Sequence, residues 1–90
     1  MSLNILNEPS NESSVLSGPQ IIAARALLKM EQRDLARLAN VSVNALSAIE
    51  RETSRPLAVT LDKIQRALER SGVEFLNGDQ PGVRLRKADR

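Results

Sequence analysis

The chain has 90 residues, enough for one small domain, and 41% of them are hydrophobic, although Phe75 is its one aromatic residue. It contains no cysteine and no histidine, which excludes disulfides and thiolate nucleophiles and removes the commonest metal ligand and general base. There is no apolar run long enough to span a membrane and no signal-peptide pattern, so we expect a soluble, cytoplasmic protein.

The net charge is only +2, but it is unevenly distributed along the chain. Residues 1–17 carry two acidic side chains and no basic one, whereas residues 18–72 carry nine basic against six acidic side chains. Such a basic middle segment is compatible with phosphate binding, but the same charges would also suit the solvated surface of ordinary helices. Charge alone therefore leaves both interpretations open.

The first 17 residues contain five serines, three asparagines and a proline, without a helical or strand period. This composition favours a flexible N-terminal arm over residues 1–17. Ser17, Gly18 and Pro19 then mark the start of the first helix, because proline is tolerated in a first turn.

The first helix has an apolar face at helical spacing, formed by Ile21, Ala24 and Leu28. Arg25 lies in the same row, where an arginine needs a partner or must extend to solvent. Ile22 and Leu27 fall on a second side of the helix. We expect that side to meet the C-terminal segment or another subunit.

The stretch from Gln32 to Arg51 predicts two short helices joined by a tight turn. Their inner faces are marked by Leu35, Ala36 and Ala39 in the first helix and by Leu46 and Ile49 in the second. Asn40 stands where the first helix should end, because asparagine tolerates the left-handed conformation found there. Val41 is expected to plug the turn and Ser42 to cap the second helix. This is the order of elements in DNA-binding helix-turn-helix motifs.

The stretch resembles the helix-turn-helix of the phage-repressor/Cro-like (XRE) family. The similarity is carried by Gln32, Leu35, Ala36, Ala39, Asn40, Val41, Ser42, Leu46, Ile49, Glu50 and Arg51. It extends from about Ile21 to Leu68 and implies a mainly α, compact, four-helix lambda-repressor-like DNA-binding domain over residues 18–72. Asn40 replaces the usual glycine. Because Glu31 and Glu52 replace the family's frequent Ser/Thr and Gly, we expect a less regular first cap and a less regular turn after the second motif helix.

The resemblance also implies which residues would contact DNA. The positions that face bases are Val43, Asn44, Ser47 and Ala48. Phosphate contacts would come from Gln32, Ser42, Arg51, Thr53, Ser54 and Arg55. Asn44 is the strongest base-reading candidate, because asparagine can bond adenine through N6 and N7. Gln32 and Ser42 could equally be plain helix caps, and both roles can coexist.

A structural ion pair is implied as well. In the resembling family, the position of Arg25 pairs with the glutamate that ends the second motif helix, here Glu50. A bidentate Arg25–Glu50 pair would tie the first helix to the recognition helix. The alternative is an Arg25 side chain that simply extends to solvent.

A fourth helix is predicted from Leu57 to about Arg70, with an uncapped beginning because leucine is a poor cap. Its inward positions are Leu61, Ile64, Ala67 and Leu68. Strand-like runs at Val73–Leu76 and Val83–Arg86 then flank a segment dense in turn residues.

These runs predict a β-hairpin with Phe75, Val83 and Leu85 on one face. A lone hairpin is marginal in water, so it must pack on the helices or pair with a second chain. Residues 73–90 are therefore predicted to be a hairpin and tail, and a candidate dimerisation element.

The sequence thus predicts a transcriptional regulator that binds a near-palindromic double-stranded DNA operator as a homodimer, with reading helices about one DNA turn, roughly 34–36 Å, apart. No nucleophile–base pair, metal cluster or glycine-rich phosphate loop is evident, so we expect no enzymatic activity, no metal, no cofactor and no membrane partner. The alternative is a protein-interaction module, an anti-activator or antitoxin-like partner that uses the same fold.

Overall fold

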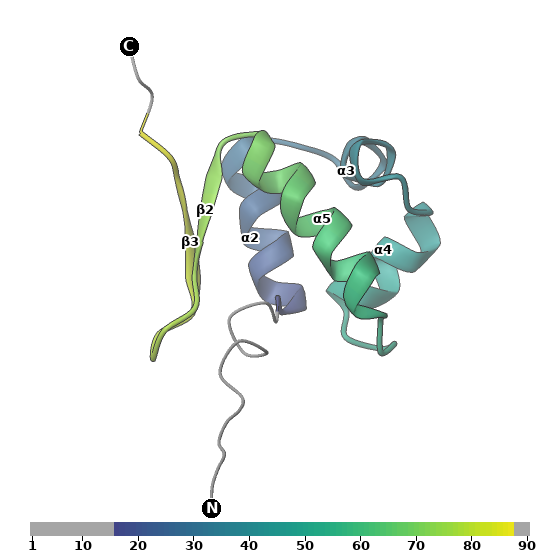
Figure 1. The fold of residues 1–90 in the computed structure, drawn as a ribbon. Coiled ribbons are helices and arrows are strands. Elements are labelled where there is room, and N and C mark those ends of the chain that lie inside the picture. Colours follow the sequence, from purple (N-terminus) through teal and green to yellow (C-terminus); the bar gives the residue numbers. More distant parts are fainter. Residues whose placement is uncertain (1–15, 88–90) are drawn as a thin grey trace, which may run out of the picture.

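The structure, a computed structural model, describes residues 16–87. Within that range four helices are followed by a two-stranded antiparallel sheet (Figure 1). The elements are α2 (Gly18–Leu28), α3 (Gln32–Ala39), α4 (Val43–Glu50), α5 (Ala58–Arg70), β2 (Val73–Leu76) and β3 (Gly82–Leu85). The predicted mainly α fold with a C-terminal β-hairpin is confirmed. The predicted flexible arm falls, over residues 1–15, outside the described residues.

Leu16 and Ser17, which were expected in the arm, belong to the folded domain. The Leu16 side chain is buried in the core. Ser17 Oγ accepts the Gln20 N–H at 3.2 Å, and Gln20 Oε1 accepts the Ser17 N–H at 3.1 Å. This reciprocal pair is a capping box, which satisfies two backbone donors and makes α2 begin at Gly18.

The beginning of α2 lies against the end of α4. A Cβ atom on Gly18 would stand 2.3 Å from the carbonyl oxygen of Glu50, so no other residue fits without movement of the backbone. The Gly18 N–H donates to Glu52 Oε2 at 3.0 Å, where the positive end of the α2 dipole favours an anion. A glycine thus lets the two helix ends meet in backbone contact.

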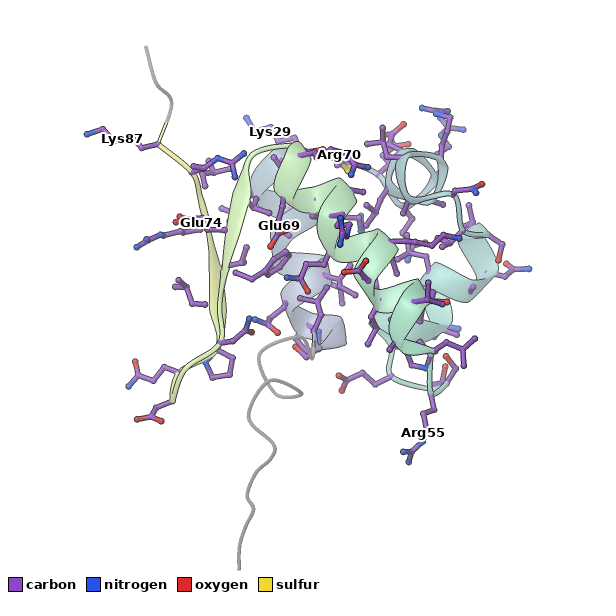
Figure 2. The ribbon with its side chains drawn as sticks, viewed as in Figure 1. Lys29, Arg55, Glu69, Arg70, Glu74 and Lys87 are labelled. Atoms are coloured by element: carbon purple, nitrogen blue, oxygen red, sulfur yellow. The ribbon has the colours of Figure 1, made fainter. Side chains whose placement is uncertain are left out.

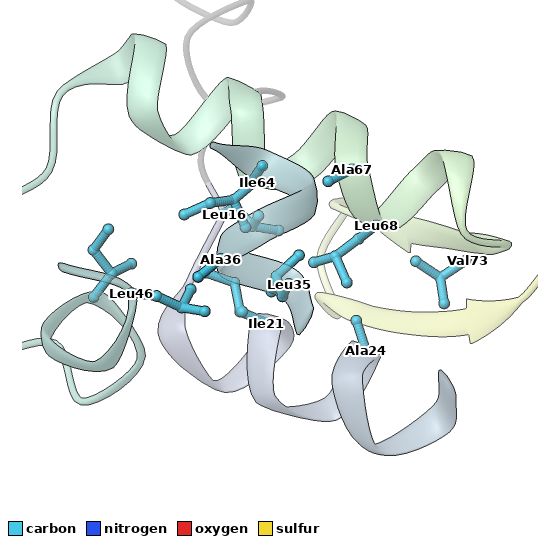
Figure 3. Packing of buried hydrophobic residues seen from close by; sticks show 12 residues of the cluster. Leu16, Ile21, Ala24, Leu35, Ala36, Leu46, Ile64, Ala67, Leu68 and Val73 are labelled. Atoms are coloured by element: carbon cyan, nitrogen blue, oxygen red, sulfur yellow. The ribbon is translucent and has the colours of Figure 1, made fainter. Parts of the chain in front are cut away.

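The core is built from small and branched aliphatic side chains (Figure 3). The largest fully buried side chains are Ile21, Leu35, Leu46, Ile64, Leu68 and Val73, which come from all four helices and from β2. Ala24, Ala36 and Ala67 are buried among them and let the helices approach closely. Because the chain has one aromatic residue, which packs at the edge of this core, stability depends on close contact between short helices.

Three non-glycine residues adopt the left-handed conformation: Lys29, Asn40 and Glu52, with φ of 56°, 59° and 61°. Asn40 ends α3 in this way, as predicted. After α4, the Thr53 N–H donates to the Ala48 carbonyl at 2.9 Å and the Glu52 N–H to the Ile49 carbonyl at 3.0 Å. These are the two bonds of a regular Schellman turn. The expectation of an irregular turn at Glu52 is therefore wrong, although its backbone conformation costs roughly 1–2 kcal/mol.

The fourth helix, α5, begins after Leu57, which makes no side-chain cap, as predicted. In the hairpin that follows, Val73 lies opposite Leu85 and Phe75 opposite Val83. Directly opposed residues share a face, and this face packs toward the helices. Leu85 is nevertheless 52% exposed, because it lies beyond the helices' reach at the end of β3. The second strand begins at Gly82, one residue before the predicted start, because Gly82 pairs with Leu76.

Gln20 joins the hairpin to α2. Its side chain is buried, and Nε2 donates to the Gly82 carbonyl at 3.0 Å, with the Asn77 Oδ1 and the Leu76 carbonyl at 3.3 and 3.4 Å. Its Oε1 is the acceptor of the Ser17 capping bond. One amide therefore both caps a helix and holds the turn end of the hairpin.

Gln20→Glu is expected to loosen this junction. The change replaces the donating amide nitrogen with a carboxylate oxygen that faces three oxygen acceptors, so a buried charge is left without a donor. We expect the free energy of unfolding to fall by about 3 kcal/mol, measured by chemical denaturation, with faster hydrogen exchange at the amides of the hairpin. Gln80→Glu, an exposed change in the hairpin turn, is the matched control. Equal stability of the two variants would contradict the role given to Gln20.

The second apolar side of α2 remains at the surface. Ile22 is 43% and Leu27 41% exposed, although the hairpin packs against the same helix. Of the two expected partners for this side, the described part of the C-terminal segment does not cover it.

Candidate nucleic-acid interface

Residues 40–42 form the turn that sets α4 at a steep angle to α3. Figure 1 shows α3 almost end-on while α4 runs across the view. Leu46, Ile49 and Glu50 point into the protein and are buried, so the opposite side of α4 is left to the solvent. A short helix held across its predecessor with one side exposed is the geometry in which a recognition helix can enter a major groove.

The four residues expected to face bases lie along the outer side of α4. Val43 and Asn44 are exposed, and Ser47 and Ala48 are half-buried. The Asn44 amide makes no hydrogen bond within residues 16–87, so both its donor and its acceptor are free. Ser47 Oγ, by contrast, accepts a hydrogen bond from Arg51 Nη1 at 2.5 Å.

Ser42 caps α4, because its Oγ accepts the Ala45 N–H at 3.0 Å. The N–H groups of Val43 and Asn44 have no partner in the described part of the chain. Two donors and the positive end of the helix dipole are thus exposed beside Ser42, an arrangement that suits a phosphate oxygen.

A buried ion pair fixes the orientation of α4. Arg25 Nε donates to Glu50 Oε2 at 2.6 Å and Arg25 Nη2 to Glu50 Oε1 at 2.9 Å, while Nη1 bonds the Met30 carbonyl at 3.0 Å. The side chains are only 18% and 3% exposed. The hydrogen bond to Glu50 raises the pKa of the Arg25 guanidinium, despite burial acting in the opposite direction. Arg25 therefore stays charged at any pH at which DNA remains double-stranded.

Gln32 is the third member of this network. Its Nε2 donates to Glu50 Oε1 at 2.8 Å, so the amide that was expected to contact a phosphate is directed to a carboxylate of the protein. The start of α3 also carries two acids, since Asp34 Oδ2 accepts the N–H of the preceding cap residue, Glu31, at 3.2 Å. A phosphate contact from Gln32 would therefore use its backbone N–H.

The remaining expected phosphate residues lie on the exposed loop that follows α4. Thr53 Oγ1 donates to the Ala48 carbonyl at 3.3 Å and so helps to end the helix. Ser54 and Arg55 make no side-chain hydrogen bond within residues 16–87. Figure 2 shows Arg55 projecting from the ribbon into solvent.

Ion pairs neutralise much of the basic charge that the sequence places in the middle of the chain. Within residues 16–87 they are Arg25–Glu50, Arg33–Glu31, Arg37–Asp34, Arg66–Asp62 and Arg84–Glu74. Arg51 and Arg55 have no such pair and leave uncompensated charge beside α4. Lys29, Arg70 and Lys87 lie at the other end of the molecule from Arg55 (Figure 2).

Two residues that position the site were not predicted. Gly18 allows α2 to touch the end of α4, and Gln20 links α2 to the hairpin. A signal for Gln20 was present, because Ser17 followed three residues later by Gln is a capping-box pattern. The approach of Gly18 to Glu50 joins residues far apart in sequence and has no local signal.

Within residues 16–87, no group of three or more acidic side chains is placed to hold a metal ion, and no helix there is both long and apolar enough to cross a membrane. A family model described as helix-turn-helix matches residues 21–75, which covers all of α3, α4 and α5 and most of α2. Among curated proteins no match was found.

Proposed function

Because this chain belongs to the helix-turn-helix family of the phage-repressor/Cro-like (XRE) type, a DNA-binding regulatory family and not an enzyme family, we propose that it controls transcription by binding a near-palindromic operator as a homodimer. Its α4 would lie in the major groove, with Asn44 bonded to adenine N6 and N7 and with Val43 and Ala48 against thymine methyl groups. Occlusion of a promoter by the bound dimer is the simplest mechanism, and it would operate in the cytoplasm.

The observation that carries this proposal is the state of α4. Its inner side is buried and held by the Arg25–Glu50 pair, while its outer side presents the unpaired amide of Asn44 between small side chains. A reading side chain on a helix that cannot rotate loses little conformational entropy when it meets a base edge. Small neighbours let the helix approach the floor of the groove.

Phosphate contacts would position this helix. Arg55 supplies an uncompensated charge from the loop after α4, and the exposed N–H groups beside Ser42 supply donors at its start. Thr53, Ser54 and the backbone N–H of Gln32 complete the set. These contacts lie at both ends of α4 and would hold it along the groove.

A homodimer is proposed because one short reading helix discriminates poorly against a genome of competing sites. Two copies related by a two-fold axis double the contact set and account for a near-palindromic site. The hairpin in residues 73–90 is our candidate for the contact, because its outer strand edge has no partner strand within residues 16–87.

Two substitutions are expected to divide the proposed roles. Asn44→Ala should cost about 1–3 kcal/mol on the preferred site and relax base preference at one position of each half-site. Arg55→Ala should weaken binding to all sequences alike and flatten the dependence of affinity on salt. Selection of bound duplexes from a random pool, followed by titration of the selected and a scrambled duplex at several salt concentrations, measures both effects. The mass of the complex gives the number of protomers per site.

The proposal has clear points of failure. Affinity for every duplex in the pool weaker than about 10⁻⁴ M at low salt would be below ordinary non-specific binding and would refute DNA recognition. Equal, sequence-blind losses from both variants would refute the role of Asn44. One protomer on the best selected site would refute the dimer.

A second candidate function, binding of a protein partner, is favoured by the outer side of α2. Ile22 and Leu27 are each more than two-fifths exposed, and Ala26 beside them is exposed too. The one charged residue within α2, Arg25, is used internally. Charge changes at Ile22 that abolish capture of a partner but leave operator binding intact would separate this function from the first.

A further inference from the structure

We propose that Arg51 reads a guanine in the operator, together with Ser47, instead of serving as a phosphate contact. The inference rests on the proposed function, since it concerns how the same helix would recognise DNA. It reassigns a residue that the family resemblance places among the phosphate contacts.

The position of Arg51 places it on the reading face of α4. Asn44, Ser47, Ala48 and Arg51 follow one another at i, i+3, i+4 and i+7, which is one face of a helix. Arg51 is the C-terminal cap of α4 with φ −84° and ψ −5°, so its backbone continues the helical path. The left-handed residue that turns the chain away is the next one, Glu52.

The side chain of Arg51 extends back along that face. Its Nη1 donates to Ser47 Oγ at 2.5 Å, one helical turn nearer the N-terminus of α4. Side chains on a helix lean toward its N-terminus, and in recognition helices the N-terminal part approaches the base edges. The bond to Ser47 therefore carries the guanidinium from the end of the helix toward the bases.

This bond leaves the other edge of the guanidinium free. An arginine has five N–H donors, of which one is used on Ser47. No carboxylate neutralises Arg51 within residues 16–87, so its charge and the Nε–Nη2 edge remain available. Two parallel donors on a planar group match guanine O6 and N7 in the major groove, which is the commonest specific arginine contact with DNA.

The phosphate role does not require Arg51. Arg55 projects from the loop four residues later without any partner among the described residues, and it is placed to contact the backbone. Asn44 lies one turn before Ser47 on the same face. A half-site in which the adenine read by Asn44 stands within one or two base pairs of a guanine is therefore expected, because one helical turn of protein spans about 5.4 Å.

The test compares base preferences of the wild-type chain with those of Arg51→Lys, Arg51→Ala and Ser47→Ala. Lysine keeps the charge but lacks the fork, so Arg51→Lys separates bidentate reading from a simple phosphate contact. We expect it to lose about 10- to 100-fold of the discrimination for guanine at one position of each half-site while its affinity for a scrambled duplex is unchanged. Ser47→Ala should weaken that discrimination without abolishing it. Arg55→Ala should leave it intact, and thermal melting checks that every variant is folded.

Three results would overturn the inference. A wild-type selection that yields a defined site without a guanine in each half-site removes the base that Arg51 is proposed to read, while leaving DNA recognition itself intact. Retention of the full wild-type preference by Arg51→Lys would show a phosphate contact. Failure of the wild-type chain to select any duplex would refute the proposed function and this inference together.

Discussion

Glu50→Ala is expected to lower the free energy of unfolding by about 3–5 kcal/mol, although Glu50 lies on the recognition helix. The carboxylate is 3% exposed and accepts both Arg25 and Gln32. Its removal leaves a guanidinium that is only 18% exposed without its counter-ion. Chemical denaturation measures the loss directly, and in a domain of this size each kcal/mol also lowers the melting temperature by about 4–8 °C.

The double variant Arg25→Met/Glu50→Leu is the control for this result. Because burial of both charges is itself costly, their joint replacement by apolar side chains should restore most of the stability lost by Glu50→Ala. If Glu50→Ala melted like the wild type and bound DNA less tightly, Glu50 would be a DNA contact and not a structural residue.

Gly18→Ala is expected to cost about 3 kcal/mol or more, which is large for the addition of one methyl group. The new Cβ would lie 2.3 Å from the Glu50 carbonyl oxygen and 2.8 Å from that of Ile49, and backbone atoms cannot rotate away as a side chain can. The first turn of α2 would have to separate from the end of α4. Thermal and chemical unfolding, together with DNA affinity, would report both the loss of stability and any tilt of α4.

Gly78→Ala is the matched control. A Cβ atom at Gly78 meets no atom within 4 Å, and neither glycine has the positive φ that only glycine tolerates easily. This variant should be neutral or slightly stabilising, by up to about 1 kcal/mol, because alanine restricts the unfolded chain. Equal melting temperatures for the two variants would mean that α2 and α4 can part without cost.

Features with a local cause could be predicted from the sequence. Asn40 adopts the left-handed conformation and Ser42 caps α4 because each acts on backbone groups within three residues. The inward positions Leu46 and Ile49 follow from helical period alone. The Arg25–Glu50 contact joins two helices and came from the resemblance to a family, since no spacing rule links residues 25 apart.

The features that were missed depend on contacts across the fold. Gln20 meets oxygens more than 50 residues away, so its sequence neighbourhood reveals only the capping half of its role. Glu52 adopts a conformation that its residue type disfavours, because the Schellman bonds and the Gly18 N–H hold it there. Burial of Leu16 depends on the hollow between helices, which a run of serines and asparagines does not announce.

The placement of the hairpin makes operator length a measure of how two copies meet. Helices α2 and α5 stand between the hairpin and α4 (Figure 1), so copies joined through their hairpins carry their α4 helices at the two far ends of the assembly. Recognition helices must enter the same side of the duplex, which allows separations of about 10 base pairs or multiples of it. Hairpin contact therefore favours half-sites about 20–21 base pairs apart, twice the one-turn spacing expected from the sequence. Half-sites about 10 base pairs apart would instead place the dimer contact on a surface next to α4.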